Sequence, residues 1–224
     1  HSICTSTEGQ GAFVCGEGSA LTASIEGHRG MPRVKPPRTV DQGLWGKPTV
    51  LNNVETYANL PGIIVNGGKW FRTIGTGNST GTKTFSVTGC IENTGLVEVP
   101  MGTTLRTIIY DICGGLKEGS EFKAVQIGGP SGGCLTEEHL DEPLDFDSVQ
   151  KFNVIIGSGG LVVMDKNTCM VEVARFFMNF TKGKAAANVY RAGKEQSGCW
   201  RYLNELWKGK GSQMILNGWN NWRI

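Results

Sequence analysis

The chain is 224 residues long and nearly neutral, with 22 lysines and arginines against 20 aspartates and glutamates. This balance gives no electrostatic basis for binding nucleic acid or an anionic membrane, and no stretch approaches the roughly 20 apolar residues that cross a bilayer. The length permits one or two small domains, and 33 glycines without a three-residue period indicate tight turns and close backbone approaches to a bound group.

The first predicted elements are a short helix and an extended strap. A glycine turn at residues 16–18 precedes a helix expected over residues 21–26, with Ser19 as its N-cap. Residues 31–48 are rich in proline, which fixes φ and removes backbone donors, so we expect an extended strap over the surface of the first lobe. Basic side chains beside these prolines indicate a solvated or subunit-facing edge rather than a nucleotide site: Arg29, Arg33, Lys35 and Arg38.

Two helical stretches and a linker follow. Apolar residues at helical spacing predict a helix over residues 53–60, with Pro61 as its stop. Residues 62–74 form a second short helical stretch by the same spacing. The run of glycine, threonine, serine and asparagine at residues 75–81 is the predicted domain boundary, because these residues favour turns and loops.

The middle of the chain predicts a small α+β module. Alternating residues 84–88 and 96–99 form two strands around a turn at residues 93–95. A helix over residues 103–112 ends at a pair of glycines. Its spacing places four aliphatic side chains on one face: Leu105, Ile108, Ile109 and Ile112.

Three further strands and one helix complete the pattern. Residues 122–127 are a strand before a sharp glycine-rich loop at residues 128–133. Residues 154–156 and 161–163 are expected to be buried strands around a glycine turn. Apolar residues at helical spacing then predict an amphipathic helix that leads into a further domain: Met170, Val173, Ala174 and Phe177.

Two polar motifs carry the candidate binding chemistry. The turn at residues 16–18 precedes a helix N-terminus whose free N–H groups suit an anion, although an ordinary strand-turn-helix has the same pattern. Its Glu17 carboxylate is either solvated or hydrogen-bonded to a ligand. Adjacent Asn52 and Asn53 either cap the next helix, which the residues alone favour, or bind the polar edge of a heterocycle. Trp45 is expected to be a packing anchor.

These motifs together resemble a known family. Residues 13–21 and 43–56, with residues 100–104 and 128–134, are similar to the NADH-binding flavoprotein subunit of respiratory complex I. They are more similar still to the flavoprotein subunits of NAD(P)-linked FeFe-type hydrogenases and formate dehydrogenases. The resemblance covers about residues 11–181.

The resemblance implies a fold with α/β and α+β parts. Residues 1–80 would be the C-terminal part of an FMN- and NAD-binding lobe, residues 81–150 a β-grasp, soluble-ligand-binding module, and residues 151–182 the start of a helical iron-sulfur domain. It implies that NAD(P)H delivers a hydride to FMN, which passes single electrons to a 4Fe-4S cluster and on to other subunits of a hydrogenase or NADH dehydrogenase complex. The cofactors carry this chemistry, so no catalytic acid, base or nucleophile is assigned.

The family motif also implies which residues bind the cofactor. Residues before position 20 match the glycine-acid turn that faces the flavin, and residues after position 50 match the segment that hydrogen-bonds FMN. The implied cofactor-binding residues are Phe13, Gly16, Glu17, Gly18, Asn52, Asn53 and Thr56. One departure is Gly18, which stands where many members have a second acid, so the family motif does not fix the detailed contacts to nicotinamide and flavin.

Parts of the family's machinery are missing from the sequence. The family's phosphate-binding glycine loop belongs upstream of His1, so we expect an internal piece of a longer protein. The seven cysteines stand singly, and five of them are expected to be buried small hydrophobes: Cys15, Cys90, Cys113, Cys134 and Cys169. The three histidines lack ligand spacing, so we expect no metal site. An odd cysteine count without a secretory signal favours reduced thiols in the cytoplasm. We expect these residues alone to bind FMN weakly and to lack diaphorase activity.

Residues 183–224 are predicted to be an out-of-frame tail. They hold Trp200, Trp207, Trp219 and Trp222, four of the six tryptophans of the chain. Reading from the last base of the Gly183 codon permits Glu-Ser-Cys-Gly-Lys-Cys-Val-Pro-Cys, whose C-x-x-C-x-x-C spacing suits an iron-sulfur cluster. The alternative is a genuine lineage-specific domain, which the interrupting glycines of the tail disfavour.

A function of another class also remains open. The chain is then a non-catalytic interaction module whose β-grasp region docks a partner subunit or binds a small ligand. Retention of a partner by residues 84–147 alone would support this alternative.

Overall fold

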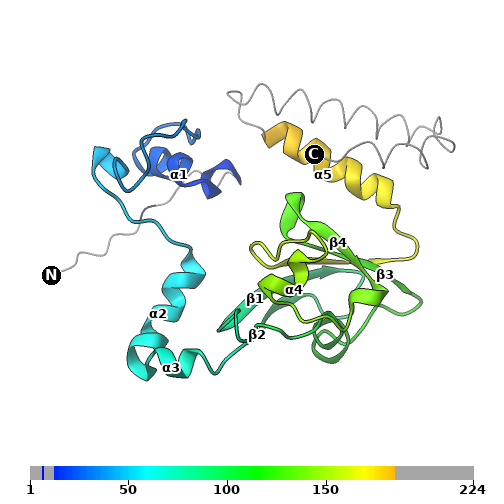
Figure 1. The fold of residues 1–224 in the computed structure, drawn as a ribbon. Coiled ribbons are helices and arrows are strands. Elements are labelled where there is room, and N and C mark those ends of the chain that lie inside the picture. Colours follow the sequence, from blue (N-terminus) through cyan, green and yellow to red (C-terminus); the bar gives the residue numbers. More distant parts are fainter. Residues whose placement is uncertain (1–6, 8–12, 185–224) are drawn as a thin grey trace. The chain divides into compact units, whose positions relative to one another are not determined.

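The computed structural model describes residue 7 and residues 13–184 (Figure 1). The described residues divide into two compact units, the first containing residues 13–59 and 178–184 and the second containing Leu60–Phe177. The predicted out-of-frame tail lies outside the described residues, apart from the end of one helix. Within the described residues, no helix combines the length and apolarity of a membrane span.

The first unit contains little regular structure. A 3-10 turn, η1 (Phe13–Gly16), leads into α1 (Gly18–Ile25), so the predicted first helix is confirmed. Between α1 and α2 (Val54–Asn66) the only regular element is a second 3-10 turn, η2 (Leu44–Gly46), as expected for the extended strap. A backbone hydrogen bond connects two segments of the strap: the N–H of Thr49 donates to the carbonyl of Thr39 at 3.0 Å.

Helix α2 runs through Pro61, so the predicted stop at this residue is wrong. Proline already has a helical φ; it removes one hydrogen bond and crowds one carbonyl without forcing the chain to leave the helix. The short helix α3 (Gly68–Phe71) follows Gly67, whose φ is 86°. The predicted stretch at residues 62–74 is therefore divided between the end of α2 and α3.

The second unit is built on a mixed five-stranded sheet in the order β2-β1-β5-β3-β4. The pairs β1/β2 and β3/β4 are antiparallel, while β5 is parallel to β1 and antiparallel to β3. The strands predicted at residues 84–88, 96–99, 122–127 and 161–163 are confirmed as β1, β2, β3 and β5, whereas β4 was not predicted. The bounds are β1 Thr82–Gly89, β2 Gly95–Pro100, β3 Phe122–Ile127, β4 Gly133–Thr136 and β5 Gly160–Asp165.

Strand β5 is the centre of this sheet. Val87 of β1 and Ile127 of β3 both lie opposite its residue Leu161, which is fully buried. The strand comes from the segment that the family resemblance assigned to the start of a helical cluster domain. The β-grasp assignment and the domain boundaries after residues 80, 150 and 182 stay predictions.

The helix predicted at residues 103–112 contains a π-helix, η3 (Thr107–Ile112). The N–H of Cys113 donates to the carbonyl of Ile108, five residues back, at 3.0 Å. The wider π turn rotates the end of the helix relative to an α-helix. Leu105, Ile108 and Ile109 are therefore fully buried as predicted, whereas Ile112 is 44% exposed.

The predicted strand at residues 154–156 is wrong, because this segment pairs with no strand. Val154 and Ile156 belong to the core, but Ile155 between them is 56% exposed. Left-handed φ values of 55° at Asn153 and 57° at Gly157 bend the backbone at both ends, so it cannot run straight along a sheet edge.

Short elements and one long helix complete the described chain. The 3-10 turns η4 (Gly129–Ser131) and η5 (Glu137–His139) flank β4, and α4 (Phe146–Gln150) follows them. Helix α5 (Met170–Lys184) confirms the amphipathic helix predicted from residue 170 onward.

Candidate functional site

The glycine-acid turn forms the start of α1. Glu17 is the N-cap: its Oε2 accepts the N–H groups of Ser19 at 2.9 Å and Ala20 at 3.0 Å. Its Oε1 lies 3.4 Å from Nζ of Lys35. The predicted N-cap, Ser19, lies inside the helix instead, and its Oγ accepts the N–H of Arg33 at 3.0 Å. The Glu17 side chain therefore orders the turn, and Ser19 ties the strap to α1.

The same contacts set the charge of Glu17. Burial acts to raise the pKa of its carboxyl group, but hydrogen bonds from the Ser19 hydroxyl, the Ala20 N–H and Lys35 outweigh burial and lower the pKa. Each of these donors favours the ionised form. Glu17 is therefore held as a carboxylate at neutral pH.

We predict that α1 loosens in acid because of Glu17. Its folded pKa is lowered, so its contribution to stability is present above the unfolded pKa and lost as pH falls through the folded pKa. Protection factors from hydrogen exchange at Ser19, Ala20 and Leu21 should show this step. Glu17→Gln keeps an acceptor oxygen and should remove the step, whereas Glu17→Ala should also lose about 1 kcal/mol of protection at neutral pH. An identical acid step in wild type and Glu17→Gln would contradict this role.

Asn52 and Asn53 lie at the start of α2 and are exposed, as is Thr56. The carbonyl of Asn53 accepts the N–H of Tyr57 at 3.2 Å, and this hydrogen bond begins the helix. Among the described residues, however, neither asparagine side chain has a recorded hydrogen-bond partner. The capping role that the residues alone favoured finds no support here, and both amides are available to a ligand.

Gly18 brings the two motifs together. A Cβ at this position would lie 2.7 Å from Cδ2 of Leu51, the residue before Asn52. A side chain at this position would require the exposed Leu51 side chain to shift, so glycine lets the turn pack against the asparagine segment without that shift. Gly16 is exposed, and no residue that the structure describes lies within 4 Å of a Cβ built there.

The aromatic residues Phe13 and Trp45 are both exposed. Phe13 is 60% exposed, and its ring makes an edge contact with Phe180, with 5.2 Å between the ring centroids. Trp45 is 68% exposed and has a left-handed φ of 50°, so the expectation of a packing anchor is wrong. The residue sits in the 3-10 turn of the strap, where its ring is carried on the surface.

The expectation that the cysteines are buried is wrong for some of them. Of the five that the structure describes, Cys113 is buried, Cys15 and Cys90 are half-buried, and Cys134 and Cys169 are exposed. Cys134 is on the edge strand β4, where alternate side chains face away from the core. No cluster of histidine, cysteine and acidic residues suited to a metal occurs in the described part of the chain.

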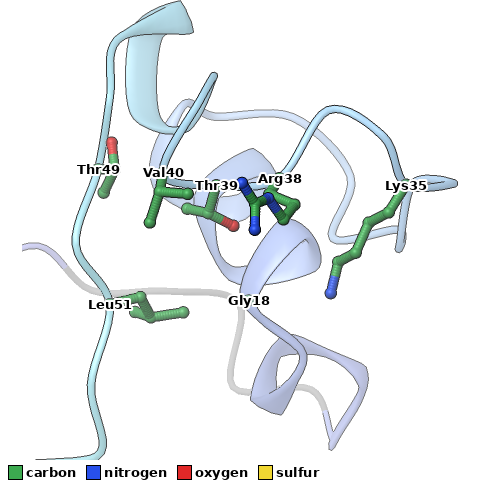
Figure 2. A pocket seen from close by; sticks show the side chains of 7 residues that line it. All are labelled: Gly18, Lys35, Arg38, Thr39, Val40, Thr49 and Leu51. Atoms are coloured by element: carbon green, nitrogen blue, oxygen red, sulfur yellow. The ribbon is translucent and has the colours of Figure 1, made fainter.

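The structure also reveals residues that sequence reasoning missed. Lys35 and Arg38, predicted to lie on a solvated or subunit-facing edge, line a pocket of about 470 Å³ beside the start of α1, here called the strap pocket (Figure 2). No local pattern links residues 35–38 to residue 18, because their proximity depends on the strap folding back over α1. The lining residues are Gly18, Lys35, Arg38, Thr39, Val40, Thr49 and Leu51.

Comparison with known proteins agrees with the sequence motifs. A family model described as the Nuo51 FMN-binding domain matches residues 3–62. The NADP-reducing hydrogenase subunit HndC of Solidesulfovibrio fructosivorans is 50% identical over 209 residues, which are 93% of this chain and 43% of that protein. The matching NADH-quinone oxidoreductase subunit of Escherichia coli K12 is 43% identical over 172 residues, which are 77% of this chain and 39% of that protein.

A solved structure shows the same relationship. The crystal structure of an air-oxidized NAD+-reducing NiFe hydrogenase matches with a TM-score of 0.78 at 35% identity, covering 89% of this chain and 34% of that one. The chain spans about two fifths of the length of the curated relatives, and identity is higher with the hydrogenase subunit, as the motifs indicated. The chain belongs to the family of flavoprotein subunits that includes hydrogenase subunit HndC and its counterpart in NADH-quinone oxidoreductase.

Proposed function

We propose that the protein containing these residues oxidises NAD(P)H through FMN and passes single electrons to iron-sulfur clusters in a multisubunit, cytoplasmic oxidoreductase of the hydrogenase or complex I type. The observation that carries this proposal is the close packing of Gly18 against Leu51, which joins the glycine-acid turn to the segment of Asn52 and Asn53. Support also comes from the match to an FMN-binding family model over residues 3–62.

The residues present fit an FMN ring system. Each of the exposed amides of Asn52 and Asn53 offers two donors and an acceptor, which suits the alternating polar edge of a heterocycle. Thr56 offers a hydroxyl one helical turn further on, and no described residue fills the space beside Gly16. FMN, when bound, supplies the acceptance of a hydride and the release of single electrons. This chain binds the FMN and orients it.

Glu17 has a positioning role in this proposal. Both carboxylate oxygens are already engaged, one by the first turn of α1 and the other by Lys35. The side chain therefore fixes the backbone of the glycine-acid turn, and the glycines on either side make the close approach to the ligand. The cluster ligands are proposed to lie in the alternative reading frame after Gly183, outside the described residues.

Titration of FMN fluorescence with the 224-residue chain tests the flavin site. We expect weak, saturable quenching, and we expect Asn52→Ala and Asn53→Ala each to weaken FMN binding roughly tenfold, because each removes hydrogen bonds made at the ligand edge. Asn66→Ala is the control: its amide donates to the carbonyl of Gly62 at 3.0 Å at the other end of α2. Absence of quenching, or equal affinity in all three variants and wild type, would contradict the proposal.

A further inference from the structure

The strap contains a loop whose backbone N–H groups find most of their acceptors inside the loop itself. This segment, residues 38–49, is here called the strap loop. The N–H of Gly43 donates to the carbonyl of Lys47 at 2.7 Å, and the N–H of Thr49 donates to the carbonyl of Thr39 at 3.0 Å. The second of these hydrogen bonds joins the two ends of the loop. The internal bonds therefore hold the strap loop together as one unit.

Trp45 is the exception within the strap loop. Every other backbone N–H from residue 41 to residue 49 has its acceptor in the loop, whereas the N–H of Trp45 donates to Oε1 of Glu26 at 2.5 Å. Glu26 is the residue that ends α1, 19 positions earlier in the chain. Its carboxylate is therefore an anchor that connects the strap loop to α1.

The backbone of Trp45 requires such an anchor. Its φ of 50° and ψ of 34° lie in the left-handed region, which a bulky residue rarely adopts. Packing of the ring does not offset this strain, because Trp45 is 68% exposed. Residues in such conformations persist only where their surroundings fix them, and they occur most often at functional sites. The hydrogen bond to Glu26 is the contact that fixes the N–H of this residue.

Helix stability does not explain a carboxylate at position 26. Glu26 is the C-cap of α1, where the last carbonyl groups of the helix carry a partial negative charge. A cation is favourable at such a place, and an anion is not. The contact with Trp45 is therefore the role that the structure gives to this carboxylate.

The strap loop leads directly into the asparagine segment. Thr49 ends the loop, and Leu51 lies beside Gly18, where a Cβ would be 2.7 Å from Leu51 Cδ2 (Figure 2). Asn52 and Asn53 follow at once in the sequence. Because the chain is held immediately before these two exposed amides, a shift of the strap loop changes where the amides lie.

We propose that Glu26 is a positioning residue of the flavin site. By holding the N–H of Trp45 it fixes the strap loop against α1, and the strap loop in turn sets the placement of the Asn52 and Asn53 amides. This inference rests on the proposed function. Glu26 acts through the strap loop and not by contact with the ligand. The two ends of α1 then serve the two binding motifs, since Glu17 orders the glycine-acid turn at the start of the helix.

Amide hydrogen exchange of the free 224-residue chain, followed by NMR, tests the anchor. Glu26→Ala should lower the protection of the Trp45 amide at least about tenfold, as expected for loss of a hydrogen bond to a charged group. The amides of Gly43 and Thr49 should lose protection with it, and the side-chain amide resonances of the two asparagines after the loop should shift. Glu26→Gln keeps an acceptor oxygen at the same reach and should preserve most of the protection.

Titration of FMN fluorescence tests the consequence for the site. Glu26→Ala should weaken FMN binding roughly tenfold, and Glu26→Gln should bind within about threefold of wild type. In a chain that already carries Asn52→Ala, the further loss from Glu26→Ala should fall to about threefold, because one of the two positioned amides is gone. The control Glu118→Ala removes an exposed carboxylate from the second unit and should leave the affinity unchanged.

The two measurements separate this inference from the flavin proposal. Unchanged exchange and unchanged asparagine resonances in Glu26→Ala overturn the inference, whether or not FMN binds. Equal losses in Glu26→Ala and Glu26→Gln also overturn it, because the role depends on an acceptor oxygen. Loss of protection with unchanged FMN affinity would make Glu26 an anchor of the strap loop alone. Failure of wild type to bind FMN would refute the flavin proposal only, because the exchange experiment still decides whether Glu26 positions the asparagine amides.

Discussion

A fragment of residues 84–147 is expected to remain unfolded, whereas residues 60–177 are expected to fold. The shorter fragment lacks β5, which pairs with β1 on one side and with β3 on the other. Without β5 the five-stranded sheet becomes two separate strand pairs, and an isolated pair is at best marginally stable in water. The longer fragment contains all five strands and the core around Leu161 and Val163.

Circular dichroism and amide NMR dispersion of the two fragments check this expectation. Residues 60–177 should give dispersed resonances and a cooperative urea transition, and residues 84–147 should give neither. A cooperative transition in the shorter fragment would show that β5 is dispensable. The alternative function, a docking or ligand-binding module, therefore has to be tested with residues 60–177, because retention of a partner by an unfolded fragment is not informative.

Substitution of Gly89 by alanine is expected to disrupt the same sheet. Gly89 is the last residue of β1 and has a φ of 104°, which residues with a side chain rarely adopt. A Cβ there would lie 2.1 Å from the carbonyl oxygen and 2.8 Å from the nitrogen of Val163 in β5. The Val163 backbone is hydrogen-bonded to strands on both sides, so it cannot shift to make room for the Cβ. We expect the free energy of unfolding to fall by about 3 kcal/mol or more.

Gly95→Ala is the matched control for this substitution. Gly95 is the first residue of the edge strand β2, and a Cβ there would meet nothing within 4 Å. Its effect should stay within about 0.5 kcal/mol, as for most surface changes. Hydrogen exchange of peptides from β1 and β5, followed by mass spectrometry in increasing urea, measures both variants. Equal protection in Gly89→Ala and Gly95→Ala would show that the close approach of β1 and β5 does not limit stability.

The sequence predicted those elements whose signals are local. The alternation at residues 84–88 and 96–99 and the apolar run at residues 161–163 gave strands, and the helical spacing from residue 170 gave α5. The errors arose where backbone geometry overrides side-chain spacing. The π turn exposes Ile112, and left-handed residues at both ends stop residues 154–156 from forming a strand.

The site was predicted less completely than the fold. The family motif identified the glycine-acid turn and the asparagine pair, but not that Gly18 packs against Leu51, because that contact joins segments far apart in the sequence. The usual N-cap preference pointed to Ser19, whereas the longer side chain of Glu17 reaches the same N–H groups from one residue outside the helix. The strap pocket depends on long-range hydrogen bonds, such as Arg33 to Ser19, that no local pattern reveals.

Amide NMR of the ¹⁵N-labelled 224-residue chain tests directly where FMN binds. We expect the largest chemical-shift changes on adding FMN at the backbone amides of residues 16–20 and at the side-chain amides of Asn52 and Asn53. Saturable changes confined to the sheet between residues 82 and 165, with those amides unaffected, would contradict this expectation.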